Sequence, residues 1–110
     1  MFRRMMLFVA TAAALAATTS IRAQDIGQQQ KGHELAQQLC SECHAVQKDQ
    51  TRSPNPNAPR FEMIAGISGM SSAALHAALQ TSHRSMPNIL LDADQMTNIV
   101  AYILSLKETR

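Results

Sequence analysis

Large apolar side chains are scarce in this sequence. Its 110 residues include no tryptophan, one tyrosine and three phenylalanines, and only two cysteines. If residues 1–23 are removed, 34 apolar residues remain among 87, and ten of the 34 are alanine. A domain of that size has a marginal core even with ordinary side chains. We therefore expect a bound cofactor to complete the interior.

The sequence also lacks the apolar–polar alternation of β-strands and any internal repeat. Its length excludes a multidomain enzyme. We predict an all-α domain of about four helices with two long loops, at residues 45–60 and 81–91. The first expected helix has about three turns and runs from Gly32 through Leu35, Ala36 and Leu39 to Cys43, and the second is short, with Pro59 in its first turn, followed by Phe61, Met63 and Ile64. A third helix is capped by Ser71 or Ser72. The last is capped by Asp92 with Gln95, and its apolar stripe consists of Met96, Ile99, Val100, Ile103 and Leu104.

No hydrophobic run is long enough for a membrane span. The longest, from Met5 to about Ala17, has about 13 residues, whereas a spanning helix needs roughly 20. It follows Arg3 and Arg4 and precedes a polar stretch that ends in Ala23, as in a secretory signal peptide. We predict a signal peptide over residues 1–23, a single domain over residues 24–110, and a periplasmic location without stable membrane insertion. An uncleaved anchor is the alternative.

Acidic residues are absent before residue 24, so the formal charge of +2 comes from the leader. Without residues 1–23 the chain has a net charge of −1, and its basic residues form no run. This pattern excludes the basic surface typical of nucleic-acid binding.

The motif with the clearest chemistry is Cys40-Ser41-Glu42-Cys43-His44. C-x-x-C-H is the attachment signature of c-type haem. Cysteines three residues apart project from one helical face, where they can form thioethers to the two vinyl groups on one porphyrin edge. The histidine that follows directly can offer a ring nitrogen to the iron. We predict one covalently attached haem c, with His44 as the proximal iron ligand.

Two other uses of these cysteines are weaker. A disulfide between Cys40 and Cys43 would make a thioredoxin-like redox site, but that fold needs a βαβ pattern, which is absent. A zinc site would need a fourth ligand at ordinary spacing, and His33 is the available residue.

With this motif, the chain resembles the small class I c-type cytochromes over nearly all of residues 28–110. Gly32 stands eight residues before Cys40, as in the N-terminal helix of that family, and the segment from Tyr102 to Leu106 resembles its C-terminal helix. The resemblance implies the cytochrome c fold, in which these two helices cross. The family usually has an aromatic residue where this chain has Ala36, so we expect Tyr102 to fill the crossing.

The resemblance also implies a second axial ligand from a Met-Pro pair, here Met86-Pro87. A proline biases the residue before it toward an extended backbone, and a thioether ligand raises the reduction potential relative to a second histidine. The strongest competitor is His83. The other candidates are expected elsewhere: Met96 in the core, Met63 and Met70 in the core or beside the haem, and His33 and His76 on the surface.

In the related cytochromes a proline carbonyl holds the other ring nitrogen of the proximal histidine, two residues before a bulky haem contact. Pro59-Arg60-Phe61 matches best, with Pro54 and Pro56 as alternatives. Arg60 or Arg52 can pair with a haem propionate.

The predicted function is one-electron transfer by a monomeric carrier that is not an enzyme. With His44 and Met86 on the iron, no position is open to a substrate. Redox proteins would dock transiently at the haem edge beside the 81–90 loop, where His83 and Arg84 make the rim basic. The alternatives are a haem sensor or peroxidase-like domain with a labile sixth position, and a small haem subunit of a dehydrogenase or oxidase complex.

Overall fold

The computed structural model describes residues 24–81 and 85–107. This part contains an N-terminal helix over residues 24–39 and three further helices, and it has no strand. The further helices are α2 (Phe61–Gly66), α3 (Ser72–Gln80) and α4 (Ala93–Ser105). The predicted all-α fold with four helices is therefore confirmed. The predicted signal peptide at residues 1–23 lies outside the described residues, as do His83 and Arg84.

The N-terminal helix is longer at its start and shorter at its end than predicted. The chain is already helical at Gln24, whereas the apolar pattern predicted a start at Gly32. Residues 28–30 are glutamines, which have good helix propensity but leave no apolar stripe to read. At the other end the helix stops at Leu39, and residues 40–43 form turns instead of carrying the helix to Cys43.

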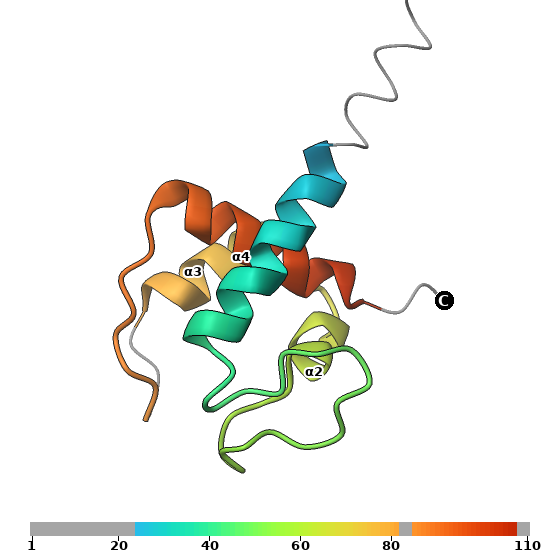
Figure 1. Cartoon of the computed structure of the whole chain (residues 1–110), viewed down its shortest axis with the longest axis vertical. Coiled ribbons are helices and arrows are strands. Elements are labelled where there is room, and N and C mark those ends of the chain that lie inside the picture. The colour runs from blue at the N-terminus through green and yellow to red at the C-terminus, as the bar shows by residue number, and fades with distance from the viewer. Residues whose placement is uncertain (1–23, 82–84, 108–110) are drawn as a thin grey trace, which may run out of the picture.

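The N-terminal helix crosses α4 at Gly32 (Figure 1). A Cβ atom added to this glycine would lie only 1.9 Å from the carbonyl oxygen of Asn98 and 2.8 Å from the Cβ atom of Tyr102. Only glycine allows the two backbones to approach so closely. Gly32 thus sets the distance between the first and the last helix.

Helix α4 is the central element of the core. Asp92 and Gln95 form the predicted capping box, in which each side chain accepts a hydrogen bond from the other residue's backbone N–H. The helix buries one apolar stripe against α2, α3 and the N-terminal helix. Its buried residues are Met96, Ile99, Val100, Tyr102 and Ile103, which confirms Met96 as a core residue.

Tyr102 fills the helix crossing beside the small Ala36, as predicted; both residues are buried in the same cluster. Its ring centroid lies 4.8 Å from that of His33 and 6.5 Å from that of Phe61. Its hydroxyl donates a hydrogen bond of 2.5 Å to the carbonyl oxygen of Val46. One tyrosine therefore joins the N-terminal helix, the loop after the motif and α4.

The shorter helices mostly begin where the sequence predicted. Ser71, rather than Ser72, caps α3, since its hydroxyl accepts a hydrogen bond from Ala74 N–H. Pro59, however, lies before α2 and not in its first turn, because the helix begins at Phe61.

Two predicted environments need correction. Met63 was expected in the core or beside the haem; it is 55% exposed on α2 and therefore does not belong to the core, while its place relative to the haem stays a prediction. His33 is not a plain surface residue, because it is half-buried against Tyr102 and its Nε2 atom lies 3.1 Å from the side-chain oxygen of Gln47. Met70 packs against the core cluster, as expected.

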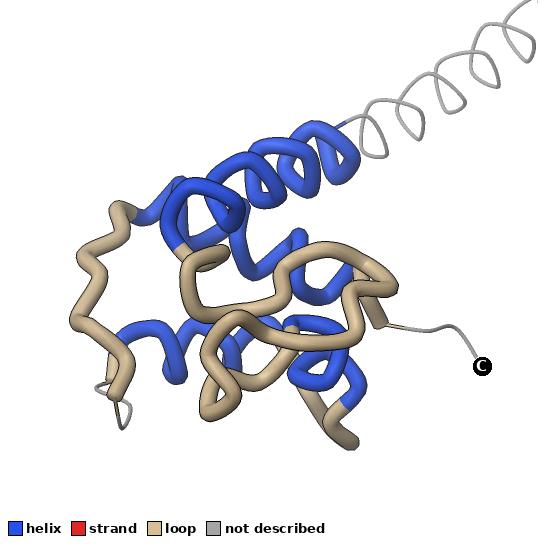
Figure 2. Tube along the Cα trace, turned by 60° about the horizontal axis from the view of Figure 1, so that its bottom comes forward, coloured by secondary structure: helices blue, strands red, loops and turns tan. Residues whose placement is uncertain are grey.

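The predicted loop at residues 45–60 wraps below the N-terminal helix and returns to α2, as the tan tube shows in Figure 2. The second loop leads from α3 to α4, and the structure describes Thr81 and the residues from Ser85 onward. None of the helices in residues 24–81 and 85–107 has the length and apolar character that a membrane crossing requires.

Candidate functional site

The C-x-x-C-H motif forms the turn that ends the N-terminal helix. The N–H of Cys43 donates to the carbonyl oxygen of Cys40 at 3.2 Å, and the N–H of His44 donates to the same oxygen at 2.9 Å. Cys40 is buried and Cys43 half-buried, and neither is in a disulfide. Both thiols are therefore free, and they stand at the end of a helix that packs into the core.

The imidazole of His44 is held by the backbone of Pro59. Nδ1 of His44 lies 2.7 Å from the carbonyl oxygen of Pro59. Because a carbonyl can only accept, Nδ1 carries the proton, and in the neutral ring this tautomer leaves the lone pair on Nε2. The ring centroid of Phe61 lies 5.4 Å from that of His44. Of the three prolines considered, Pro59 thus makes the expected hydrogen bond, and the aromatic residue two positions later packs against the imidazole.

Three further hydrogen bonds fasten the 45–60 loop to the backbone around His44, and we refer to them as the loop clasp. The N–H of Asn55 donates to the carbonyl oxygen of Cys43 at 3.1 Å, and the N–H of Phe61 donates to that of Ala45 at 3.0 Å. The N–H of Ala45 donates to the hydroxyl oxygen of Ser53, also at 3.0 Å. The loop clasp brings the Pro59 carbonyl under the imidazole.

The two arginines considered for a propionate differ in their surroundings. Arg60 donates to the carbonyl oxygen of Gln50 at 3.3 Å and lies 3.6 Å from the carboxylate of Glu62. Arg52 is exposed. Arg60 therefore stabilises the loop and the start of α2, and Arg52 is the more available cation.

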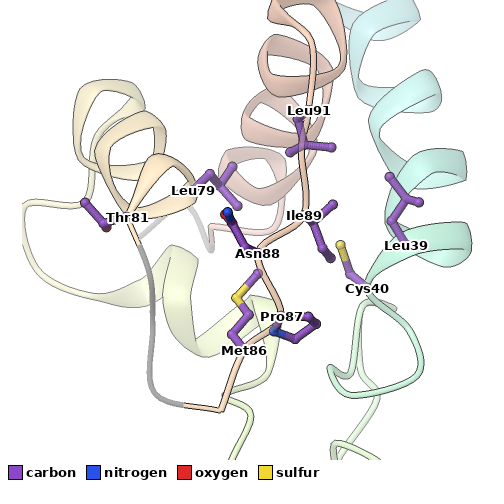
Figure 3. Close-up of a pocket in the computed structure, with 9 residues that line it drawn as sticks. All are labelled: Leu39, Cys40, Leu79, Thr81, Met86, Pro87, Asn88, Ile89 and Leu91. Atoms are coloured by element: carbon purple, nitrogen blue, oxygen red, sulfur yellow. The ribbon is translucent and has the colours of Figure 1, made fainter.

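Met86 and Cys40 line one pocket, although they lie 46 positions apart (Figure 3). Figure 3 shows loop residues 86–91 running between α3 and the N-terminal helix, with Leu79 on one side and Leu39 on the other. Met86 is half-buried there. The full lining is apolar except for Thr81 and Asn88, and consists of Leu39, Cys40, Leu79, Thr81, Met86, Pro87, Asn88, Ile89 and Leu91.

The thiol chemistry of Cys40 argues against a thioredoxin-like site. Burial raises the pKa of this thiol from 9.0 to about 11, so that the nucleophilic thiolate is disfavoured at neutral pH. A zinc site finds no support either: in the described part of the chain, no three His, Cys, Asp or Glu side chains are grouped closely enough to hold a metal ion.

The residues present do fit a covalently attached haem. Two free cysteines could supply two thioether positions, a histidine with an available ring nitrogen could supply an imidazole ligand, and a methionine in an apolar pocket could supply a soft sulfur ligand. The competing ligand His83 lies outside the described residues. Met63 is exposed on α2 and does not line the pocket.

Sequence reasoning missed two features of this site. Ser53 was not considered, because its hydrogen bond with Ala45 lies in an irregular loop, where no periodic pattern of residues indicates such a bond. Ser85, directly before Met86, has a positive φ of 63°. A positive φ is uncommon for residues other than glycine, so a serine in the sequence does not indicate it.

A family model for cytochrome c matches residues 29–107. No curated protein and no solved structure gives a significant match. The matched region includes the motif, the 45–60 loop, the pocket and α4. The chain therefore belongs to the cytochrome c family, and Cys40 and Cys43 stand at the spacing through which this family attaches haem c covalently.

Proposed function

We propose that this protein is an exported one-electron carrier whose haem iron is bound by His44 and Met86. Membership of the cytochrome c family supports haem binding and electron transport. The observation that carries the ligand assignment is the placement of Met86 and Cys40 in one apolar pocket, together with the His44–Pro59 hydrogen bond that leaves Nε2 of His44 available. The bound haem supplies the redox chemistry, as its iron alternates between Fe(II) and Fe(III).

Residues of the chain favour metal binding by both proposed iron ligands, His44 and Met86. Pro59 fixes the tautomer and the ring orientation of His44, and a hydrogen bond at Nδ1 makes an imidazole a stronger donor to a metal. The residues around Met86 are mostly aliphatic, an environment that favours a neutral sulfur ligand. With His44 and Met86 both holding the iron, no position would be left open to a substrate, which suits electron transfer.

The proposed docking surface is the rim beside Met86. Leu90 is 88% exposed, and Pro87 and Asn88 are also exposed. A small, partly apolar surface of this kind suits the brief complexes through which redox proteins exchange electrons. We propose that the protein is a monomer and that its redox partners, the electron donors and acceptors, dock at this surface.

The proposed location is the periplasm. The leader-like pattern of residues 1–23 supports export, and residues 24–110 would form the mature cytochrome domain. C-type haem attachment through Cys40 and Cys43 is in keeping with an exported protein.

The ligand assignment is tested by the ferric absorption spectrum of the holoprotein and of Met86→Ala. The wild type should be six-coordinate, with the weak band that arises from sulfur-to-iron coordination, and should bind added imidazole or cyanide poorly. Met86→Ala should lose the band and bind both ligands readily.

Met63→Ala is the matched control, because it removes an exposed methionine from α2. It should retain the band. If the band persists in Met86→Ala, another residue is the ligand; if the wild type binds cyanide as readily as Met86→Ala does, the protein is a sensor or an enzyme and not a carrier.

A further inference from the structure

Ser53 holds the backbone directly after His44. Its hydroxyl oxygen accepts a hydrogen bond of 3.0 Å from the N–H of Ala45, a residue that is only 1% exposed. This N–H belongs to the peptide group that joins His44 to Ala45. The bond therefore fixes the backbone rotation that directs the His44 side chain.

The rest of the loop clasp places the Pro59 carbonyl relative to the same backbone. Asn55 is tied to Cys43 and Phe61 to Ala45, and these two ties flank Pro59 in the sequence. Both use backbone atoms only, so a substitution does not remove them directly. The hydroxyl of Ser53 is the one side-chain group among the three bonds of the clasp.

We propose that Ser53 is a positioning residue for His44, which keeps the imidazole oriented so that its Nδ1–H points at the Pro59 carbonyl. The inference rests on the proposed function, in which Nε2 of His44 binds the haem iron. A well-formed hydrogen bond at Nδ1 strengthens the imidazole as a donor. A stronger donor favours Fe(III) over Fe(II), so the Ser53 hydroxyl lowers the reduction potential.

The test compares Ser53→Thr with Ser53→Val in the holoprotein. The two side chains have nearly the same shape, but only threonine retains the hydroxyl oxygen that accepts from Ala45. Ser53→Thr should have the reduction potential of the wild type, whereas that of Ser53→Val should be higher. Both should retain the band from sulfur-to-iron coordination, since residues 86–91 take no part in the loop clasp.

Ser71 provides a matched control. Its hydroxyl also accepts a hydrogen bond from a backbone N–H, that of Ala74 at 3.2 Å, but it does so at the start of α3. Ser71→Val should lose stability relative to Ser71→Thr without a shift in reduction potential. If Ser53→Val does not accumulate as holoprotein, the smaller Ser53→Ala carries the same expectation of a raised potential.

Equal potentials for Ser53→Thr and the hydroxyl-free variant would overturn the proposal, and so would an equal shift in Ser71→Val. These outcomes differ from a failure of the proposed function. That failure would appear in the wild type itself, as a spectrum without sulfur-to-iron coordination, whatever residue stands at position 53.

Discussion

The hydroxyl of Tyr102 donates a hydrogen bond of 2.5 Å to the carbonyl oxygen of Val46, which lies 56 positions earlier in the chain. Both residues are buried. The bond therefore joins the last helix to the loop that follows the haem-attachment motif, and it satisfies a carbonyl group that water does not reach.

Tyr102→Phe should destabilise the folded protein by about 1–3 kcal/mol, because it leaves the buried Val46 carbonyl without that partner. Denaturant unfolding of the holoprotein measures the change in the free energy of unfolding. Ser105→Ala is the control: it removes a hydroxyl that also bonds to a backbone carbonyl, but at an exposed position. Its effect should be smaller, and equal losses in the two variants would contradict the prediction.

The same residue predicts a pH dependence. Burial raises the pKa of the Tyr102 phenol above its usual value of 10.0. The unfolded chain therefore loses this proton at a lower pH than the folded chain, so stability should fall as the pH rises above about 10. Tyr102 is the single tyrosine of the chain, so the signal of ¹³Cζ-labelled tyrosine in an NMR titration follows this group alone. A midpoint at or below 10 would contradict the prediction.

Two glycines in the N-terminal helix should respond oppositely to alanine. Gly32→Ala should destabilise the protein by several kcal/mol, about 3 or more, since its Cβ atom would collide with the backbone of Asn98. Gly27→Ala meets nothing within 4 Å and should stabilise the helix by about 0.5–1 kcal/mol. Thermal unfolding should therefore show shifts of opposite sign. If both variants are more stable than the wild type, the N-terminal helix does not approach α4 as closely at Gly32 as the structure shows.

Asp92→Ala should cost about 0.5–2 kcal/mol, because it removes the side chain that accepts from Gln95 N–H at the start of α4. Asp94→Ala, in the first turn of the same helix, retains the capping box and should cost less. Denaturant unfolding of both variants compares the stability lost with the Asp92 cap with the stability lost with the Asp94 charge. A larger loss in Asp94→Ala would show that helix-dipole interactions dominate.

The features that could be predicted from the sequence are those with a local or periodic pattern. The capping box at Asp92, the cap at Ser71 and the buried stripe of α4 follow from residue spacing. The bond from His44 to Pro59 followed from the resemblance to class I cytochromes.

The features that could not be predicted depend on tertiary contact. The early start of the N-terminal helix could not be predicted, because residues 24–30 carry no apolar stripe. His33 appeared to be a surface residue, since nothing in its neighbourhood indicates that Tyr102 lies against it. Met63 has the composition of a core residue, and only the position of α2 shows that it points outward.

The crossing at Gly32 has a consequence for biosynthesis. The N-terminal helix packs against α4. A chain that is still being synthesised therefore lacks the surface against which this helix packs until α4 has been made. Nascent chains therefore cannot form this helix crossing until α4 has been synthesised.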